Sequence, residues 1–301
     1  MKNNDFIILD FDSKLFGFKV AKILSPRLDL EHLQSILQTL REKNVKLVYW
    51  ASAHEDKKSQ EAACEMGGFL ADMKVTYVTL TELKKLHLSS LPFKTLGLSQ
   101  IDPSILRMRL GAKERAPRVY INIHEDTSDE GNNAATQKAM GIDKFKVTPE
   151  IIEYKSNNPS RALEALAMEI SKYSHFKTDP QCPPRLVIKM YKKWITNSIN
   201  GKIAKHVLVY KKGRRIAGFI TLGEKNGRGD IGLLAVDAAF RGQGIGYKLI
   251  TAAQKQFLQD NYKYSQVVTQ LGNIAACRLY EKSGYVIEKI ENFYHFHLTG
   301  S

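Results

Sequence analysis

A glycine-rich turn at residues 241–246 constrains this chain more than any other segment. It reads Arg-Gly-Gln-Gly-Ile-Gly and lies between a predicted strand, residues 230–236, and a predicted helix that begins at Tyr247. Glycines permit a tight turn and a close approach of the backbone to a ligand. The first amides of a helix lack intrahelical acceptors, and the helix dipole favours an anion there. The turn therefore predicts an α/β fold that holds an anion, such as a pyrophosphate, at the start of this helix.

The rest of the pattern divides the chain into three parts. Residues 1–85 are predicted to form a small α/β domain, because short apolar strands alternate with helical periodicity. Residues 86–150 contain a polar, turn-rich stretch and are interpreted as a linker or insertion, partly irregular. Residues 151–301 are predicted to form a second, larger α/β domain, which carries the glycine-rich turn.

An internal echo links the first and third parts. Residues 62–69 and 275–285 both begin Ala-Ala-Cys in a helical pattern, end at glycine and precede a predicted strand. The echo indicates that the small N-terminal domain is a reduced copy of the larger one.

Composition limits the partners. The formal net charge is +14, which favours anionic partners, either nucleic acid or a phosphate-rich small molecule. No nucleic-acid-binding signature is present, so nucleic acid is not favoured. The chain has no apolar run of about 18–20 residues and no signal-peptide pattern, so we expect a cytoplasmic protein without membrane contact.

The three cysteines, Cys64, Cys182 and Cys277, are odd in number and far apart in the chain. Their spacing fits no metal motif, so we expect reduced thiols and no metal.

Two ordered motifs point to a family. Arg-x-x-Gly-x-Gly after a strand resembles the acetyl-CoA pyrophosphate motif of the GNAT acetyltransferase superfamily. Asn273, the small residues after it, Tyr280 and the Gly284-Tyr285 pair resemble a second hallmark of that superfamily. A dinucleotide fold would need another glycine spacing and an acidic residue about 20 positions on. The resemblance implies a GNAT fold, which is an α/β fold with a mixed, splayed central sheet flanked by helices, and an N-terminal domain that is a degenerate GNAT-like half.

The resemblance also implies where acetyl-CoA, the co-substrate, binds. The strand before the turn would pair its backbone with the pantetheine arm, the turn would hold the pyrophosphate, and an asparagine would bond the arm. The implied coenzyme-binding residues are Leu233, Leu234, Val236, Arg241, Gly242, Gln243, Gly244, Ile245, Gly246, Tyr247 and Asn273. Core packing is the alternative role of the strand side chains, and capping of the following helix is the alternative for Asn273.

Two residues are candidate catalysts. Tyr280 matches the superfamily tyrosine that donates a proton to the coenzyme A sulfur, although its spacing also fits a core aromatic. Glu224 ends a predicted strand beside the splay and is the candidate general base, although a solvated turn carboxylate fits equally.

A closer resemblance concerns the acceptor. Residues 218–276 and the opening Leu9–Gly17 are similar to the TDP-fucosamine acetyltransferase family, which implies that Asp12 and Ser13 line the acceptor site. The expected acceptor is a small-molecule primary amine, in particular that of an amino-sugar nucleotide. The alternatives are the amine of a protein, peptide, aminoglycoside or polyamine, a non-catalytic acyl-CoA-binding module, and a nucleic-acid-binding protein. A homodimer is left open as the assembly.

Overall fold

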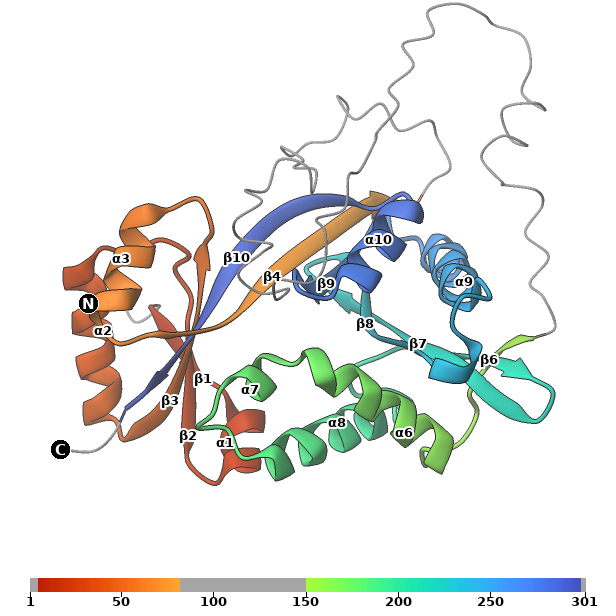
Figure 1. The fold of residues 1–301 in the computed structure, drawn as a ribbon, viewed down its shortest axis with the longest axis horizontal. Coiled ribbons are helices and arrows are strands. Elements are labelled where there is room, and N and C mark those ends of the chain that lie inside the picture. The colour runs from red at the N-terminus through yellow and green to blue at the C-terminus, as the bar shows by residue number, and fades with distance from the viewer. Residues whose placement is uncertain (1–4, 82–149, 299–301) are drawn as a thin grey trace, which may run out of the picture.

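The computed structural model describes residues 5–81 and 150–298 (Figure 1). Ten strands form one mixed sheet in the order β1-β2-β3-β10-β4-β9-β8-β7-β6-β5. The strands are β1 Phe6–Ile8, β2 Lys19–Ile23, β3 Val45–Ala53, β4 Phe69–Leu80, β5 Ile151–Glu153, β6 His206–Lys212, β7 Arg215–Lys225, β8 Arg228–Val236, β9 Tyr264–Gln270 and β10 Val286–His297. The helices are α1 Asp10–Phe16, α2 Leu30–Glu42, α3 Lys57–Glu65, α6 Arg161–Ile170, α7 His175–Thr178, α8 Pro184–Ile199, α9 Ile245–Gln259 and α10 Ile274–Lys282, with the 3-10 turns η3 Ser171–Tyr173 and η4 Ala238–Phe240.

Helices cover both faces of the sheet. Buried residues of α9 and α10 pack over the middle and C-terminal strands, and those of α2 and α3 pack over the N-terminal strands. Buried residues of α1, α6, α7 and α8 form a separate core against the opposite face (Figure 1). The mixed, splayed sheet flanked by helices that the sequence predicts is confirmed.

The sheet repeats itself about its centre. Each half begins with an antiparallel strand pair, β1 and β2 (joined through α1) or β7 and β8. A helix, a parallel strand, a second helix and a final strand follow: α2-β3-α3-β4 in the first half and α9-β9-α10-β10 in the second. The parallel pairs are β2 with β3 and β8 with β9, and the other neighbouring strands are antiparallel. The sequence echo between α3 and α10 therefore marks corresponding elements of two related halves.

The final strand of each half lies inside the other half. β4 lies between β9 and β10, with Lys74 opposite Gln270, and β10 lies between β3 and β4, with Phe293 opposite Ala51. β10 is long enough to do this because Val286–His295 pairs with β4 while Glu291–His297 also pairs with β3. The two halves therefore share one hydrogen-bonded sheet.

The proposed linker lies almost wholly outside the described residues, which stop at Thr81 and resume at Glu150. The domain boundaries at residues 85 and 150 thus stay a prediction. Among the described helices, none combines the length and apolar character needed to cross a membrane.

Candidate functional site

The parallel strands β8 and β9 separate after a short contact. They pair only from Gly229 to Ile231, opposite Ser265 to Val267. Further along, β8 shifts register against β7, and the Leu233 amide donates to the Thr221 hydroxyl oxygen at 2.8 Å. Such an irregularity bends a strand. The sheet therefore opens beyond Ile231, where the sequence analysis placed the coenzyme-binding strand.

The side chains of this strand do not point the same way. Leu233 is buried against the core of α6 and α8, whereas Leu234 and Val236 pack on the other face, against the core of α9 and α10. Because the side chains pack on both faces, only the backbone of these residues is available at the opening.

The glycine-rich turn follows η4 and enters α9. Gly242 and Gly244 have φ angles of 78° and 74°, the left-handed region that side-chain-bearing residues disfavour. Gly244 is the N-cap, and the first amide to bond back into the helix is that of Lys248, which donates to the Gly244 carbonyl oxygen at 3.0 Å. The amides before it belong to the helix start, where an anion is favoured.

Two further residues of the turn are packed rather than exposed. Ile245 is buried in the core beneath α9. A Cβ on Gly246 would lie 2.8 Å from a methyl carbon of Leu279 on α10, so α9 and α10 approach closely there. α9 begins at Ile245, two residues before the expected Tyr247, because the left-handed Gly244 is the turn that starts it.

Polar contacts hold the remaining turn residues. The Arg241 Nε donates to the Val236 carbonyl oxygen at 3.2 Å, and its guanidinium lies 3.6 Å from Glu169. Gln243 accepts from the Lys212 ammonium at 2.7 Å. These contacts tie the turn to β8, to α6 and to the hairpin between β6 and β7.

The second motif lies on α10, beside the turn. The Asn273 side chain caps this helix by accepting from the Ala276 amide at 3.3 Å, which is the alternative role the sequence allowed. Tyr280 is 5% exposed, and its ring lies 5.8 Å from that of Tyr77 and 6.1 Å from that of Tyr285. Burial, with Tyr285 and Cys277 nearby, raises the pKa of Tyr280 above its usual value, so the phenol carries its proton at neutral pH.

A cavity of about 900 Å³ occupies the other face of the sheet. It reaches the separation of β8 and β9 at Ile231 and Gly232, and extends past β4 and β10 to α1, α7 and α8. Its charged lining residues are Asp12, Lys22, Lys74, Lys225, Arg228, Asp230, Glu288, Lys289 and Glu291. The cavity therefore meets the opening in the sheet from the side opposite α9 and α10.

The charged groups of this cavity are perturbed by burial. Burial lowers the pKa of Lys74 to about 7 against the opposing effect of Asp72, and the ammonium lies 3.2 Å from the centre of the Phe293 ring. Burial raises the pKa of Asp12, which Lys74 partly offsets. Burial also raises the pKa of Asp230, whose carboxylate accepts from Gln266 at 2.9 Å.

Of the residues predicted from the sequence to bind the acceptor or act as the base, Asp12 alone lines the cavity. Asp12 lines the cavity, whereas the Ser13 hydroxyl accepts from the Val20 amide at 2.9 Å and fixes α1 on β2. Glu224 lies at the outer end of β7, is half exposed and accepts from the Tyr262 hydroxyl at 3.0 Å. It is not among the cavity-lining residues.

Sequence reasoning missed Lys74 and His175, two cavity residues from different halves of the chain. Lys74 lies in an alternating strand, where a lysine usually faces solvent, and His175 lies in a one-turn helix without a strong pattern. Only the pairing of β4 inside the C-terminal half brings them to one cavity.

The N-terminal half lacks an equivalent of the glycine-rich turn. Its parallel pair, β2 and β3, stays paired over the whole of β2. The following helix, α2, has Asp29 as its N-cap, and the Asp29 carboxylate accepts from the His32 amide at 2.9 Å. A carboxylate thus occupies the helix start that an anion would need, so within residues 5–81 the start of α2 does not offer a corresponding anion site.

Comparison with known proteins agrees with this geometry. The family model described as "Acetyltransferase (GNAT) family" matches residues 167–285. The chain is 31% identical over 152 residues to a dTDP-fucosamine acetyltransferase of Escherichia coli, covering 50% of this chain and 64% of that protein. It is 25% identical over 162 residues to the spore coat polysaccharide biosynthesis protein SpsD of Bacillus subtilis, covering 53% of this chain and 55% of that protein.

Among solved structures, the chain is similar in fold to a GCN5-related N-acetyltransferase from Sphaerobacter thermophilus. The TM-score is 0.51 at 11% sequence identity, covering 97% of this chain and 76% of the other. The matched residues hold the separated strands, the glycine-rich turn and the helix that carries Tyr280. Residues 167–285 therefore match the GNAT acetyltransferase family, and the fold of the described chain is that of GNAT proteins.

Proposed function

We propose that this protein is an acetyl-CoA-dependent N-acetyltransferase that acts on the primary amine of an amino-sugar nucleotide. The observation that carries the proposal is the opening between β8 and β9, which has an anion-binding turn at one side and the 900 Å³ cavity at the other. Donor and acceptor can therefore meet at the opening from opposite faces of one sheet, and such orientation of two reactants is a large part of catalysis.

On the donor side, the backbone of Leu233, Leu234 and Val236 is proposed to pair with the pantetheine arm, joined by Asn273. The turn from Arg241 to Gly246, with Tyr247, is proposed to hold the pyrophosphate. Gly242 and Gly244 support this role because their left-handed backbones turn successive amides toward one point at the helix start.

Tyr280 is proposed as the general acid. In the reaction the amine nitrogen attacks the thioester carbonyl, the carbon–sulfur bond breaks, the amine loses a proton and the departing thiolate gains one. The Tyr280 phenol is protonated at neutral pH and therefore has a proton to donate to the departing thiolate. General acid–base assistance of this kind contributes about 10²- to 10⁴-fold.

The amine must be deprotonated before it attacks. Glu224 stays the base predicted from the sequence, although its carboxylate is half exposed outside the cavity. Asp230 is a second candidate, because it lines the cavity one residue before the strands separate, and burial raises its pKa above that of an exposed carboxyl group.

The acceptor class rests on the relatives and on the charge of the cavity. One curated relative is named for dTDP-fucosamine and another for polysaccharide biosynthesis. The chain spans little more than half the length of these proteins, 55% of SpsD and 64% of the acetyltransferase. Lys22 and Lys225 line the cavity with Lys74 and are proposed to bind a diphosphate, whereas Arg228 and Lys289 pair with Glu288 and Glu291.

The test is a turnover screen with acetyl-CoA and candidate amines, read by mass spectrometry. The panel contains amino-sugar nucleotides, the same amino sugars without nucleotide, aminoglycosides, polyamines and peptides. An acetylated sugar nucleotide, with slower turnover of the free sugar, is expected. Turnover of another class of amine alone would refute the sugar-nucleotide acceptor, while the assignment as an acetyltransferase would stand. Binding of acetyl-CoA without acetylation of any amine in the panel would favour a non-catalytic acyl-CoA-binding module.

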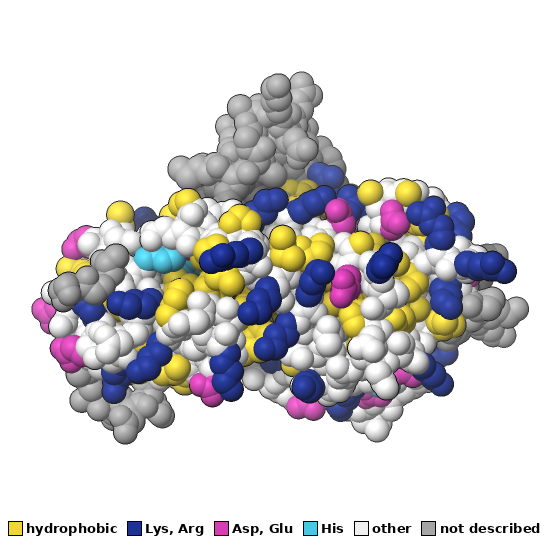
Figure 2. Space-filling model, turned by 90° about the horizontal axis from the view of Figure 1, so that it is seen from below, with side chains coloured by type: hydrophobic (Ala, Val, Ile, Leu, Met, Phe, Trp, Pro, Cys, Tyr) yellow, Lys and Arg dark blue, Asp and Glu magenta, His cyan; other side chains and the backbone are white. Residues whose placement is uncertain are grey.

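The basic surface calls for a separate test of nucleic-acid binding. Lys and Arg side chains are spread across the face seen in Figure 2, with hydrophobic side chains between them, rather than gathered into one stripe. Salt-dependent retention of RNA or DNA, without acetyl transfer, would favour nucleic-acid binding instead.

A further inference from the structure

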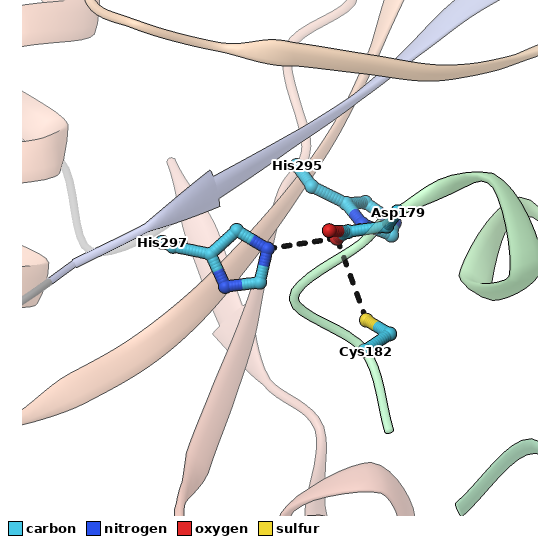
Figure 3. Close-up of side chains that lie close together, drawn as sticks. All are labelled: Asp179, Cys182, His295 and His297. Atoms are coloured by element: carbon cyan, nitrogen blue, oxygen red, sulfur yellow. Dashed lines mark hydrogen bonds and ion pairs between the residues drawn. The ribbon is translucent and has the colours of Figure 1, made fainter. Parts of the chain in front are cut away.

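Four metal-ligating side chains meet beside the cavity, from two segments more than 100 residues apart. They are Asp179, Cys182, His295 and His297, called here the Asp179 cluster. The first two lie between α7 and α8, and the histidines lie near the end of β10 (Figure 3). One carboxylate oxygen of Asp179, Oδ2, lies 2.5 Å from His295 Nδ1, 2.7 Å from His297 Nε2 and 3.4 Å from Cys182 Sγ. All four ligand atoms lie within 4.8 Å of one another.

Local structure explains the convergence. In the Asp179-Pro-Gln-Cys182 turn, the Gln181 amide donates to the Asp179 carboxylate and the Cys182 amide donates to the Asp179 carbonyl oxygen. Both ligands are thus held on one side of the turn. Residues two apart on a strand point to the same face, which places His295 beside His297.

The cluster is buried and has the donor chemistry of a zinc site. The side chains of Asp179 and His295 are 1% and 0% exposed, that of His297 is 18% exposed, and Cys182 is buried. Structural zinc sites use four nitrogen, sulfur or oxygen ligands, commonly at short spacings along the chain. We propose that the Asp179 cluster binds one Zn²⁺ through Asp179 Oδ2, Cys182 Sγ, His295 Nδ1 and His297 Nε2.

Charge and neighbouring contacts support this assignment. In the described parts of the chain, the ion pairs of Asp179 are with His295 and His297 alone, so no permanent cation is paired with this buried carboxylate. One carboxylate and one thiolate balance a divalent ion, with Cys182 releasing its thiol proton on binding. His295 Nε2 lies 2.9 Å from His175 Nδ1, a hydrogen bond from the far side of the ring that would orient a ligand histidine.

The present separations are those of hydrogen bonds, and binding requires a small rearrangement. Zinc bonds of roughly 2.0–2.3 Å place tetrahedral ligand atoms about 3.3–3.7 Å apart. The two nitrogen–oxygen separations must therefore increase by less than 1 Å, the sulfur–oxygen separation already fits, and the widest separations, up to 4.8 Å, must shorten by about 1 Å. Rotation of the Asp179 carboxylate out of the centre of the cluster achieves this.

A metal here would connect the end of β10 to the segment between α7 and α8. That segment joins two helices that line the cavity. Ser174, His175 and Phe176 lie at and in α7, before the turn, and Met190 and Tyr191 lie in α8, after it. A closed site with four protein ligands leaves no position for substrate, so the role is structural. The proposal is independent of acetyl transfer.

The experiment measures zinc on the full-length chain. Protein produced with added Zn²⁺ is dialysed against buffer without chelator, and its metal content is determined by plasma mass spectrometry. About one Zn²⁺ per chain is expected. Cys182→Ser and His297→Gln should each bind zinc at least roughly 10-fold more weakly in competition with a chromogenic chelator. Cys64→Ser, which removes an exposed thiol outside the cluster, is the control and should bind like the wild type.

A second measurement needs no variant. Co²⁺ substituted into the wild-type chain should show the intense visible bands of tetrahedral cobalt and a thiolate-to-cobalt charge-transfer band, both lost in Cys182→Ser. A strong chelator should lower the melting temperature of the wild type and of Cys64→Ser, and leave that of Cys182→Ser unchanged. A folded wild type that acquires no zinc from a weak chelator, or that binds cobalt without the charge-transfer band, would show that the cluster is only hydrogen-bonded.

Discussion

Gly244→Ala tests whether the glycine-rich turn holds the coenzyme. Gly244 has a φ angle of 74°, and a Cβ added there would meet no heavy atom within 4 Å. The substitution therefore introduces backbone strain and no collision. A left-handed conformation costs a residue with a Cβ about 1–2 kcal/mol, and the lower entropy of the unfolded alanine chain offsets about 0.4–1 kcal/mol of this. The expected loss in the free energy of unfolding is thus about 1 kcal/mol.

Gly67→Ala is the matched control. Gly67 has a φ angle of 71°, again with no atom within 4 Å of an added Cβ, but it follows α3 in the N-terminal half. Both variants should lose about the same stability in urea unfolding, because they carry the same strain. A difference between them in coenzyme binding then reports on the position of Gly244 alone.

The expected difference is large. Strain at Gly244 is relieved if its peptide rotates, which turns an amide of the helix start away from the pyrophosphate. A hydrogen bond to a charged group contributes about 1.5–3 kcal/mol, so losing one should raise the dissociation constant of acetyl-CoA about 10- to 100-fold by calorimetry. Gly67→Ala should bind like the wild type. Wild-type affinity in a folded Gly244→Ala protein would refute the assignment of this turn to the coenzyme.

Three further predictions concern the acid, the cavity and the core. Tyr280→Phe should lower kcat by about 100-fold or more without changing the dissociation constant of acetyl-CoA; unchanged turnover in steady-state assays would remove Tyr280 from the acid role. Burial lowers the pKa of Lys74 to about 7, so between about pH 7 and pH 10 the unfolded chain binds a proton that the folded chain does not. Stability should therefore rise with pH across this window, and Lys74→Met should flatten the rise in urea unfolding; an equal slope in both proteins would contradict the lowered pKa. A methyl group on Gly229 would overlap the Phe257 ring, so Gly229→Ala should lose about 1–3 kcal/mol. Gly272→Ala, where a Cβ meets open space, should change the free energy of unfolding by less than about 0.5 kcal/mol, and equal losses in the two variants would contradict the packing argument.

The strand, turn and helix start proposed to hold the coenzyme were predictable from sequence because they are local. The strand, the turn and the helix start follow one another between Arg228 and Gln259, so their chemistry depends on neighbours in the chain. α1 was not predicted, because Asp10–Phe16 is a single short helix that ends at the left-handed Gly17 and has little periodicity.

The acceptor side was not predictable because it depends on pairings between distant segments. Lys74 reaches the cavity only because β4 pairs with both β9 and β10. In the same way, the expectation of no metal rested on the spacing of cysteines along the chain. Cys182 meets His295 and His297 only after β10 has crossed into the N-terminal half.

The exchange of β4 and β10 also explains why two related halves give one site. Each half supplies a parallel pair and a following helix, but the pair separates only in the C-terminal half. In the N-terminal half, β2 and β3 stay paired, and the Asp29 carboxylate fills the helix start with a negative charge. Its strands instead form the far wall of the cavity, through Lys22, Tyr49 and Ala51. The N-terminal half therefore contributes strands to the cavity rather than a second glycine-rich turn, and its β4 supplies Lys74 to the cavity of the C-terminal half.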